Sequence, residues 1–392
     1  MAICGGSIGG LTAGVLLRDL GCHVDIFERS ASELQGRGAG IVAHQVSVRY
    51  LVENQIADID ALSVVTHHHI HVDARGTAIH DDPSGYRFTS WNTLHRNLLR
   101  SIGSDRYHLG HAVIGFRNSG SEVIVETVGG KVACDLLICA DGVASTGRAI
   151  LQPEAVPRYA GYVAWRGTVP ETALSQSAVA ALEDTIIYHW TGTSHVLGYL
   201  IPGANGGVEP GRRLLNFVWY RNVAPAKIAD LMTDASGVEH PLSMPPGAVR
   251  RPHILELSQA AEALPPVLAE LVLATREPLI QKIVDVEVDR MAFGRVCLIG
   301  DAAFTARPHA GAGTAKTAAD AWALADAVRA NGDAQAALAA WEPAQLALGR
   351  QLVARARELG ERSQFRGTWR PGDPYQRFGL WQPGDCRIGV TA

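Results

Sequence analysis

The chain has 392 residues and a hydrophobic content of 47%, enough to bury a large core. Its formal net charge is −4 and its basic residues are scattered, so neither nucleic acid nor a membrane is an expected partner. No apolar run approaches the ~18 residues of a spanning helix, and the opening residues leave no room for a signal peptide. The six cysteines form no Cys-x-x-Cys pair and are expected to be free thiols. We therefore expect a cytoplasmic protein.

The first 30 residues predict a strand, a glycine turn, a helix and a second strand. The turn reads GGSIGG from Gly5 to Gly10, with Ser7 where the dinucleotide fingerprint has its middle glycine. Serine is small, and its hydroxyl can donate a hydrogen bond to a phosphate oxygen. Glu28 follows at roughly the 20-residue spacing at which an acid binds ribose hydroxyls. The pattern predicts a dinucleotide-binding βαβ unit.

Two later segments repeat the order of strand, glycine turn and helix. In residues 135–148 an apolar run leads into Asp141-Gly142, and in residues 294–328 a strand leads into Gly300-Asp301 and a Pro/Gly loop. Each acidic pair alone is also a favoured turn sequence. Alternating, sheet-like segments separate these turns. We therefore expect an α/β protein: a Rossmann-like domain with an inserted, sheet-rich α+β domain.

The predicted domain boundaries follow these changes in pattern. The nucleotide-binding domain is expected at 1–66, 92–155 and 282–363, and the inserted substrate domain at 67–91 and 156–281. The remainder, 364–392, reads as a C-terminal tail rich in proline, glycine and tryptophan.

The three turns, in this order and spacing, resemble those of the FAD-dependent aromatic hydroxylases, the para-hydroxybenzoate hydroxylase-like flavoprotein monooxygenases. The stretches YAGYVAWRG, LNFVWY and RPHAGAGTAK extend the similarity along the chain. The resemblance implies that FAD is bound by Gly5, Ser7, Ile8, Gly10, Glu28, Arg29, Asp141, Gly142, Asp301, Pro308, Gly311, Ala312 and Gly313. Asp301 would hold the ribityl chain, and Gly311 and Gly313 would present backbone N–H groups to the flavin.

The resemblance also implies the reaction. NADPH or NADH would act as a transient co-substrate, O2 would react with the reduced flavin to give a C4a-hydroperoxide, and a hydroxylated aromatic or N-heteroaromatic ring would be hydroxylated. A dihydroxypyridine is the expected substrate, and a homodimer the expected assembly. His309 or Tyr199 is expected to activate the substrate hydroxyl. Arg166 is a candidate for a role at the domain boundary near the flavin.

The chain departs from the family pattern at three places near the flavin. Trp91 and Asn92 stand where an arginine is common, Ala315 and Lys316 where an asparagine is common, and Phe304 where a histidine is frequent. These departures concern the outer contacts of the flavin.

The same residues also allow other interpretations. Other ring substrates (salicylate, hydroxynicotinate or urate), an epoxidase, and a non-catalytic nucleotide-fold binding protein stay open. A P-loop NTPase is disfavoured because Ala315 precedes Lys316 where glycine is required. His67, His69 and His71 share one strand face, but no acid or cysteine completes a site, so we expect a solvated strand and no metal.

Overall fold

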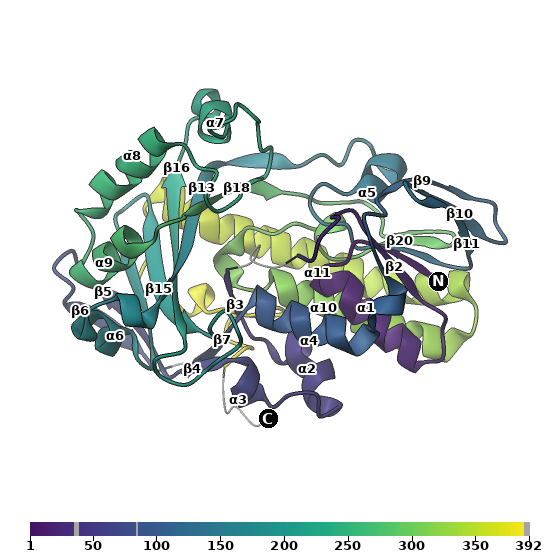
Figure 1. Ribbon diagram of the computed structural model, residues 1–392, viewed down its shortest axis with the longest axis horizontal. Coiled ribbons are helices and arrows are strands. Elements are labelled where there is room, and N and C mark those ends of the chain that lie inside the picture. Colours follow the sequence, from purple (N-terminus) through teal and green to yellow (C-terminus); the bar gives the residue numbers. More distant parts are fainter. Residues whose placement is uncertain (35–38, 84, 388–392) are drawn as a thin grey trace.

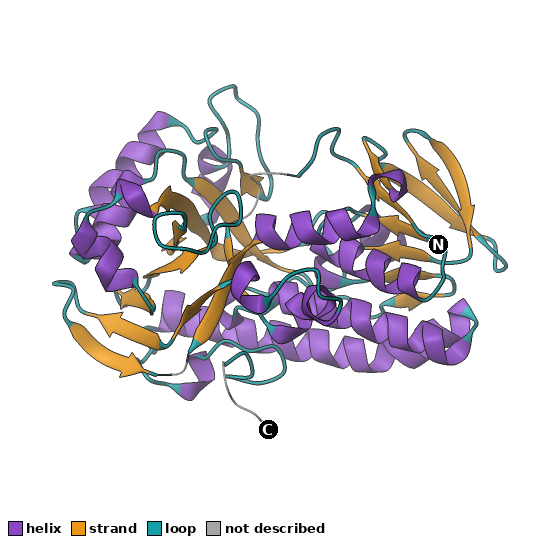
Figure 2. Cartoon of the chain, turned by 60° about the horizontal axis from the view of Figure 1, so that its bottom comes forward, coloured by secondary structure: helices purple, strands orange, loops and turns teal. Residues whose placement is uncertain are grey.

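The computed structural model describes residues 1–34, 39–83 and 85–387. The molecule is elongated, with a nucleotide-type parallel sheet toward one end and a larger sheet toward the other (Figure 1). The two long helices α10 (Gly313–Asn331) and α11 (Ala334–Glu361) pack against each other and run along the length of the molecule, from the parallel sheet toward the larger sheet (Figures 1 and 2).

The parallel sheet has the strand order β19-β20-β12-β1-β2-β8. Its strands are β1 (Ala2–Cys4), β2 (Asp25–Glu28), β8 (Tyr107–Leu109), β12 (Leu137–Cys139), β19 (Ala292–Phe293) and β20 (Val296–Leu298). All neighbours are parallel except β19 and β20. Such strands are covered on both faces and read as continuous apolar runs; Ile3, Ile138 and Cys297 are fully buried.

Helix α1 (Ile8–Asp19) packs against both α4 (Trp91–Ile102) and α10. Because β1, β12 and β20 are parallel neighbours, their carboxyl ends meet at one edge of the sheet. The three turns singled out in the sequence follow these ends, so the fold brings them together. The predicted α/β fold class is confirmed.

The larger sheet has the order β17-β18-β13-β16-β15-β14-β5-β6. Its strands are β5 (His68–Val72), β6 (Ala78–Asp82), β13 (Arg158–Pro170), β14 (Thr185–Trp190), β15 (His195–Ile201), β16 (Leu214–Asn222), β17 (Ser243–Met244) and β18 (Leu279–Asp285). Helices α6 (Gln176–Leu182), α8 (Arg251–Ala261) and α9 (Pro266–Ala274) lie along one face (Figure 1). Strand β5 pairs in parallel with β14 and antiparallel with β6.

Strand alternation divides the side chains of this sheet between two cores. On β15, Val196 and Leu200 pack toward the helices, whereas Leu197 and Tyr199 belong to the opposite core. Trp219 and Tyr220 of β16 divide in the same way. The face away from the helices therefore presents aromatic side chains toward the parallel sheet.

Smaller elements complete the fold. Strands β3 (Gly40–Val42), β4 (Val64–Thr66) and β7 (Tyr86–Ser90) form one small sheet, and β9 (Val113–Asn118), β10 (Val123–Thr127) and β11 (Gly130–Cys134) form another. The remaining α-helices are α2 (Gln45–Glu53), α3 (Ile59–Leu62), α5 (Thr146–Leu151) and α7 (Pro225–Leu231). No helix in the described part of the chain is long and apolar enough to cross a membrane.

The histidine-rich strand β5 corrects one expectation. His69 and His71 are 5% and 3% exposed, their rings stack 4.9 Å apart, and both contact Tyr188. The prediction of a solvated strand is therefore wrong for these two residues, because β5 lies inside the sheet between β14 and β6. Only His67 and His68 lie toward solvent, beside Asp184 and Asp81. Within the described ranges, no group of three potential ligands could hold a metal ion.

The C-terminal segment, residues 362–387, returns from α11 to the larger sheet. It begins with a π-helical turn (Arg362–Arg366) and includes a short 3-10 helix (Pro374–Gln376). Arg377 forms an ion pair with Asp82 at 2.9 Å, and Trp369 and Phe378 are buried. This part of the predicted tail thus belongs to the core, while its residues 388–392 lie outside the described residues.

Candidate active site

A cavity of about 390 Å³ lies at the carboxyl edge of the parallel sheet, lined by Gly5, Gly6, Ser7, Glu28, Arg29, Asp141 and Gly142, among others. Close backbone packing shapes it. A Cβ on Gly10 would lie 1.9 Å from the Gly5 carbonyl oxygen, and one on Gly5 would lie 2.5 Å from that of Ala140. Glycine is therefore required at both positions, and Ile8 is buried beneath the turn.

Ser7 is the N-cap of α1, and its side chain makes no capping hydrogen bond. The first N–H groups of a helix and its dipole favour a bound anion at such an end. Together with the uncommitted hydroxyl of Ser7, this turn offers a donor set suited to a pyrophosphate.

Glu28 ends β2 and is buried at the rim of the same cavity. Its carboxylate accepts hydrogen bonds from the backbone N–H groups of Gly6 at 2.9 Å and Ser30 at 2.8 Å. These bonds fix the carboxylate where a ribose would lie, while Arg29 is exposed at the edge. Asp141 accepts from Ser145 Oγ at 2.5 Å and from the Gly147 N–H at 3.2 Å, so it also organises the start of α5.

A second cavity of about 370 Å³ lies between the parallel sheet and the aromatic face of the larger sheet. We call it the ring cavity. Its lining includes Phe88, Arg166, Tyr188, His195, Tyr199, Tyr220, Asp301, Pro308, His309, Gly311, Ala312, Gly313, Trp369 and Phe378. Trp91 lines both cavities, so the two adjoin, and an elongated ligand could extend from the glycine turn to the ring cavity.

Asp301 follows β20 at the border of the ring cavity. Desolvation raises the pKa of its carboxyl to about 6, although Lys316 and Arg148 oppose the rise. Beyond it, Gly311 adopts a left-handed φ of +63°, and a Cβ on Gly313 would meet no atom within 4 Å. The backbone of this loop carries no side chain at either glycine, and the open space beside Gly313 leaves room for a flat ring. The glycine turn, Glu28, Asp301 and this loop together fit FAD.

The two residues expected to act on substrate both line the ring cavity. His309 is buried, its Nε2 lies 2.6 Å from the Tyr162 hydroxyl, and Nδ1 has no hydrogen-bond partner in the described structure. Desolvation lowers the pKa of His309 well below its ordinary value, and burial raises that of Tyr199. Both side chains are therefore neutral near pH 7.

Arg166 of β13 lines the ring cavity. Its guanidinium donates to Gln281 Oε1 at 3.0 Å and to the Gly40 carbonyl at 2.7 Å. Among the described residues no carboxylate forms an ion pair with it. The ring cavity thus contains a guanidinium that makes hydrogen bonds but no ion pair with the described residues.

Two of the departures from the family pattern contact each other. Lys316 forms a buried ion pair with Asp320 at 2.5 Å, and its ammonium lies 5.0 Å from the centre of the Phe304 ring. Asp320 also accepts from the Gly300 N–H at 2.8 Å. Lys316 is therefore committed to the core of α10. The third departure, Trp91, stacks on His95, whose Nε2 lies 3.1 Å from the Gly6 carbonyl oxygen.

Sequence reasoning missed several residues of the ring cavity, among them Tyr188, His195 and Trp369. His195 had a signal, because it precedes Tyr199 by an even number of strand residues and so shares its face. No sequence pattern indicated Trp369, because its place in the cavity depends on how the C-terminal segment folds back onto the larger sheet.

A flavin-dependent monooxygenase is the class that this fold and these adjoining cavities define. The comparisons agree: the model for the FAD binding domain-like family matches residues 159–285. The 2,6-dihydroxypyridine 3-monooxygenase of Paenarthrobacter nicotinovorans is 37% identical over 384 residues, which cover 97% of this chain and 95% of that protein. The chain therefore belongs to the FAD-dependent aromatic-ring monooxygenases, as the sequence motifs predicted.

Solved structures show the same relationship. The 2,6-dihydroxypyridine-3-hydroxylase from Arthrobacter nicotinovorans superposes with a TM-score of 0.92 at 36% identity, covering 97% of both chains. HpxO of Klebsiella pneumoniae, solved with FAD and uric acid, has a TM-score of 0.76 at 24% identity and shares the fold, covering 93% of this chain and 89% of its own. FAD is the cofactor of this enzyme, and NAD(P)H is the typical reducing co-substrate of these monooxygenases.

Proposed function

We propose that this enzyme hydroxylates a dihydroxypyridine, with NADH or NADPH as electron donor and O2 as the source of the oxygen atom. The observation that carries the proposal is the ring cavity itself: a space of about 370 Å³ that combines aromatic walls with the unpaired cation of Arg166. The named activity of the 37% identical relative supports the same substrate class.

The chemistry of a dihydroxypyridine suits this cavity. The ring is flat, and Phe88 stacks on Tyr199 at 4.0 Å to form one aromatic wall. Its hydroxyl groups are acidic, and the anion would be attracted to Arg166 in a partly desolvated site. Loss of a hydroxyl proton also makes the ring electron-rich, which electrophilic hydroxylation requires.

We place FAD along the two adjoining cavities. Gly5, Ser7, Ile8 and Gly10 would form the pyrophosphate turn, with Glu28 and Arg29 at the adenosine ribose. Asp141, Gly142 and Asp301 would border the ribityl side, and Pro308, Gly311, Ala312 and Gly313 the flavin ring. Bound there, FAD supplies the oxidation–reduction and O2 chemistry. The chain's own residues orient the substrate and exclude water.

We further propose that His309 or Tyr199 assists the loss of the substrate hydroxyl proton. In the tautomer whose Nε2–H donates to the Tyr162 hydroxyl, Nδ1 of His309 is the nitrogen that can accept this proton. The neutral imidazole is the form that a base requires, and the burial that lowers the pKa of His309 makes the protonated ring release that proton readily.

The test is NAD(P)H oxidation by the FAD-loaded protein across hydroxypyridines, phenols, salicylate, hydroxynicotinate and urate, with hydroxylated product and peroxide quantified separately. We expect a 2,6-dihydroxypyridine to stimulate oxidation most and to give product with little peroxide. Tyr199→Phe and His309→Gln should slow hydroxylation while FAD stays bound. If no hydroxypyridine stimulates oxidation, the substrate assignment is wrong.

We also propose, from the family resemblance, that the enzyme is a homodimer and that it works in the cytoplasm. Sedimentation analysis of the purified protein and fractionation of the cells that produce it test these two points.

A further inference from the structure

His195 begins β15 and lies at the centre of the ring cavity's aromatic side chains. It is 2% exposed, and its ring stacks on Trp369 at a centroid distance of 5.0 Å and an interplanar angle of 19°. The rings of Tyr220 and His309 lie 4.6 and 5.2 Å away. The imidazole is thus held in one orientation by packing on several sides.

The two nitrogens of His195 have different surroundings. Nδ1 lies 3.1 Å from Ser363 Oγ, and Ser363 Oγ accepts a hydrogen bond from Gln364 Nε2 at 2.7 Å. The Ser363 hydroxyl can donate its hydrogen to Nδ1, and Gln364 Nε2, a donor only, also lies 3.4 Å from Nδ1, so the surroundings favour Nδ1 as the acceptor. A neutral imidazole that accepts at Nδ1 carries its proton at Nε2.

Nε2 is the atom left for a ligand. No hydrogen bond joins it to any residue in the described part of the chain, although the side chain lines the ring cavity. Burial lowers the pKa of His195 to about 3, so the ring stays neutral and Nε2 remains an N–H donor. An N–H donor at an aromatic cavity suits an oxygen substituent on the ring that binds there.

The residues that set this tautomer are themselves fixed. The Ser363 carbonyl accepts from Trp190 Nε1 at 3.3 Å, and the Gln364 carbonyl accepts from Asn222 Nδ2 at 2.8 Å. Both acceptors lie in the π-helical turn that ends α11. The C-terminal segment therefore provides both the partner of Nδ1 and, through Trp369, the surface on which the imidazole stacks.

We propose that His195 donates a hydrogen bond from Nε2 to a ring oxygen of the bound substrate, and that Ser363 and Gln364 are positioning residues that hold the required tautomer. The inference rests on the proposed function and adds to it a specificity-determining contact. It assigns to the C-terminal segment a part in the recognition of the second oxygen of a dihydroxypyridine.

The experiment measures substrate binding to the oxidised, FAD-loaded protein without NAD(P)H, by the change in flavin absorbance. Two ligands are compared: 2,6-dihydroxypyridine and 2-hydroxypyridine, which lacks one oxygen. His195→Phe should weaken binding of the dihydroxypyridine by about tenfold or more, because one buried hydrogen bond is lost. It should leave 2-hydroxypyridine binding and the FAD content unchanged.

Matched variants separate the contact from a structural effect. His195→Gln places an amide N–H near the Nε2 position and should retain affinity within about threefold of the wild type. This loss is smaller than the loss expected when one hydrogen bond is removed. Ser363→Ala should weaken binding several-fold, and Ser363→Thr should restore it. His189→Gln is the control, because the His189 side chain bonds the Val72 carbonyl on the neighbouring strand and does not line the ring cavity.

The outcomes are distinguishable. If wild-type protein binds 2,6-dihydroxypyridine and His195→Phe binds it equally well, the inference is overturned and the proposed function stands. If His195→Gln is as weak as His195→Phe while both keep FAD, the donor role is overturned. If wild-type, FAD-loaded protein binds no dihydroxypyridine, the proposed function fails and the inference fails with it.

Discussion

Ser7 illustrates how much one side chain can alter a binding turn. It occupies the position at which glycine normally lets the backbone approach the pyrophosphate. In the structure it is an extended N-cap residue (φ −82°) whose hydroxyl makes no bond to its own helix. The side chain lines the cavity at the glycine turn, so its hydroxyl can contribute a donor where a glycine would contribute only space.

Replacing Ser7 separates these two contributions. Ser7→Gly removes the hydroxyl but opens space, whereas Ser7→Val removes the hydroxyl and adds bulk at the phosphate position. We expect Ser7→Val to weaken FAD binding by about tenfold more than Ser7→Gly does, because both variants lose the hydroxyl and only valine adds bulk that holds the phosphate away from the backbone N–H groups. Flavin fluorescence quenching on titration of the apoprotein measures both. Retention of the wild-type FAD affinity by both variants would show that Ser7 makes no such contact.

Asp301 should make FAD binding depend on pH. Its pKa in the protein without ligand is raised to about 6 by desolvation, so much of the carboxyl is protonated at pH 5 and ionised at pH 7. The ionised carboxylate is the better acceptor for ribityl hydroxyls, and FAD affinity should therefore rise from pH 5 to pH 7. In Asp301→Asn this rise should disappear. The same titration at several pH values tests it; an unchanged profile in Asp301→Asn contradicts the assignment.

At the scale of elements, α10 is tied to the parallel sheet by a buried ion pair. Lys316 and Asp320 are one turn apart on the helix, and the second bond of Asp320 fixes the Gly300 N–H at the end of β20. Removal of one member of a buried pair leaves an uncompensated charge, which typically costs about 3–5 kcal/mol. Sequence alone did not predict this pair, because Lys316 stood in a phosphate-loop-like context.

Lys316→Met should therefore lower the thermal unfolding midpoint of the apoprotein by several degrees. Lys227→Met is the control, since Lys227 is exposed on α7 and should change the midpoint little. Differential scanning calorimetry of the two variants and the wild type measures the effect. A Lys316→Met midpoint equal to that of the control would mean that the pair does not stabilise the fold.

The alternating sequence patterns predicted where strands form more accurately than they predicted which strand side chains are buried. Alternation along β15 and β16 correctly separates the cavity face from the helix-covered face. The same reasoning failed for His69 and His71, because a polar alternating strand is solvated only if nothing covers it. Tyr86 and Tyr188 cover this one, and their approach depends on segments distant in sequence.

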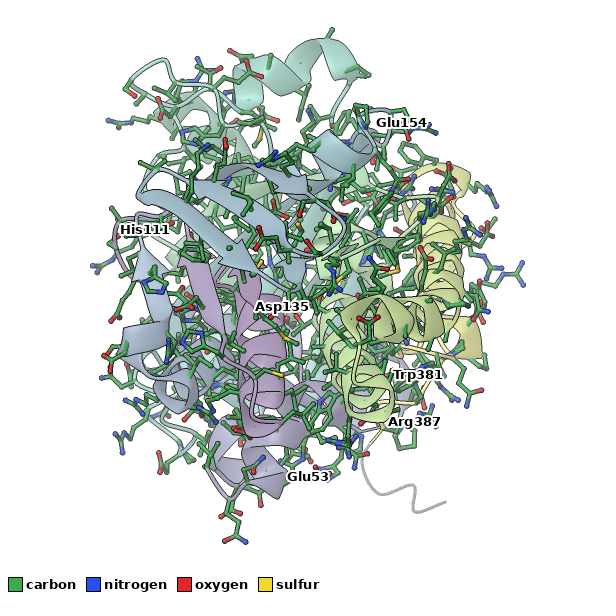
Figure 3. The ribbon with its side chains drawn as sticks, turned by 90° about the vertical axis from the view of Figure 1, so that its right-hand side faces the viewer. Glu53, His111, Asp135, Glu154, Trp381 and Arg387 are labelled. Atoms are coloured by element: carbon green, nitrogen blue, oxygen red, sulfur yellow. The ribbon has the colours of Figure 1, made fainter. Side chains whose placement is uncertain are left out.

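At the scale of the molecule, the predictable part of the site is the part built from local motifs. Gly5–Gly10, Asp141 and Asp301 each follow a parallel strand, so their meeting at one sheet edge follows from topology. No comparable topological rule predicts which residues line the ring cavity. This cavity forms where the larger sheet meets α10, and residues 362–387 close it: Trp369 and Phe378 reach it only because α11 returns the chain there. Trp381, on the same segment, is 59% exposed at the surface (Figure 3).

The two adjoining cavities divide the binding contacts of the enzyme between its two sheets. Dinucleotide contacts lie at the parallel sheet, aromatic and cationic contacts lie at the larger sheet, and Trp91 borders both. A cofactor that spans both cavities would hold its reactive ring against a substrate enclosed by the second sheet and the C-terminal segment.

The most direct test of this account is the fate of molecular oxygen. FAD-loaded protein is given NAD(P)H, 2,6-dihydroxypyridine and ¹⁸O-labelled O2, and the product is analysed by mass spectrometry. The account predicts a hydroxylated pyridine that carries one labelled oxygen atom, formed in proportion to the NAD(P)H consumed. NAD(P)H oxidation that yields only peroxide, with unlabelled and unchanged dihydroxypyridine, would contradict it.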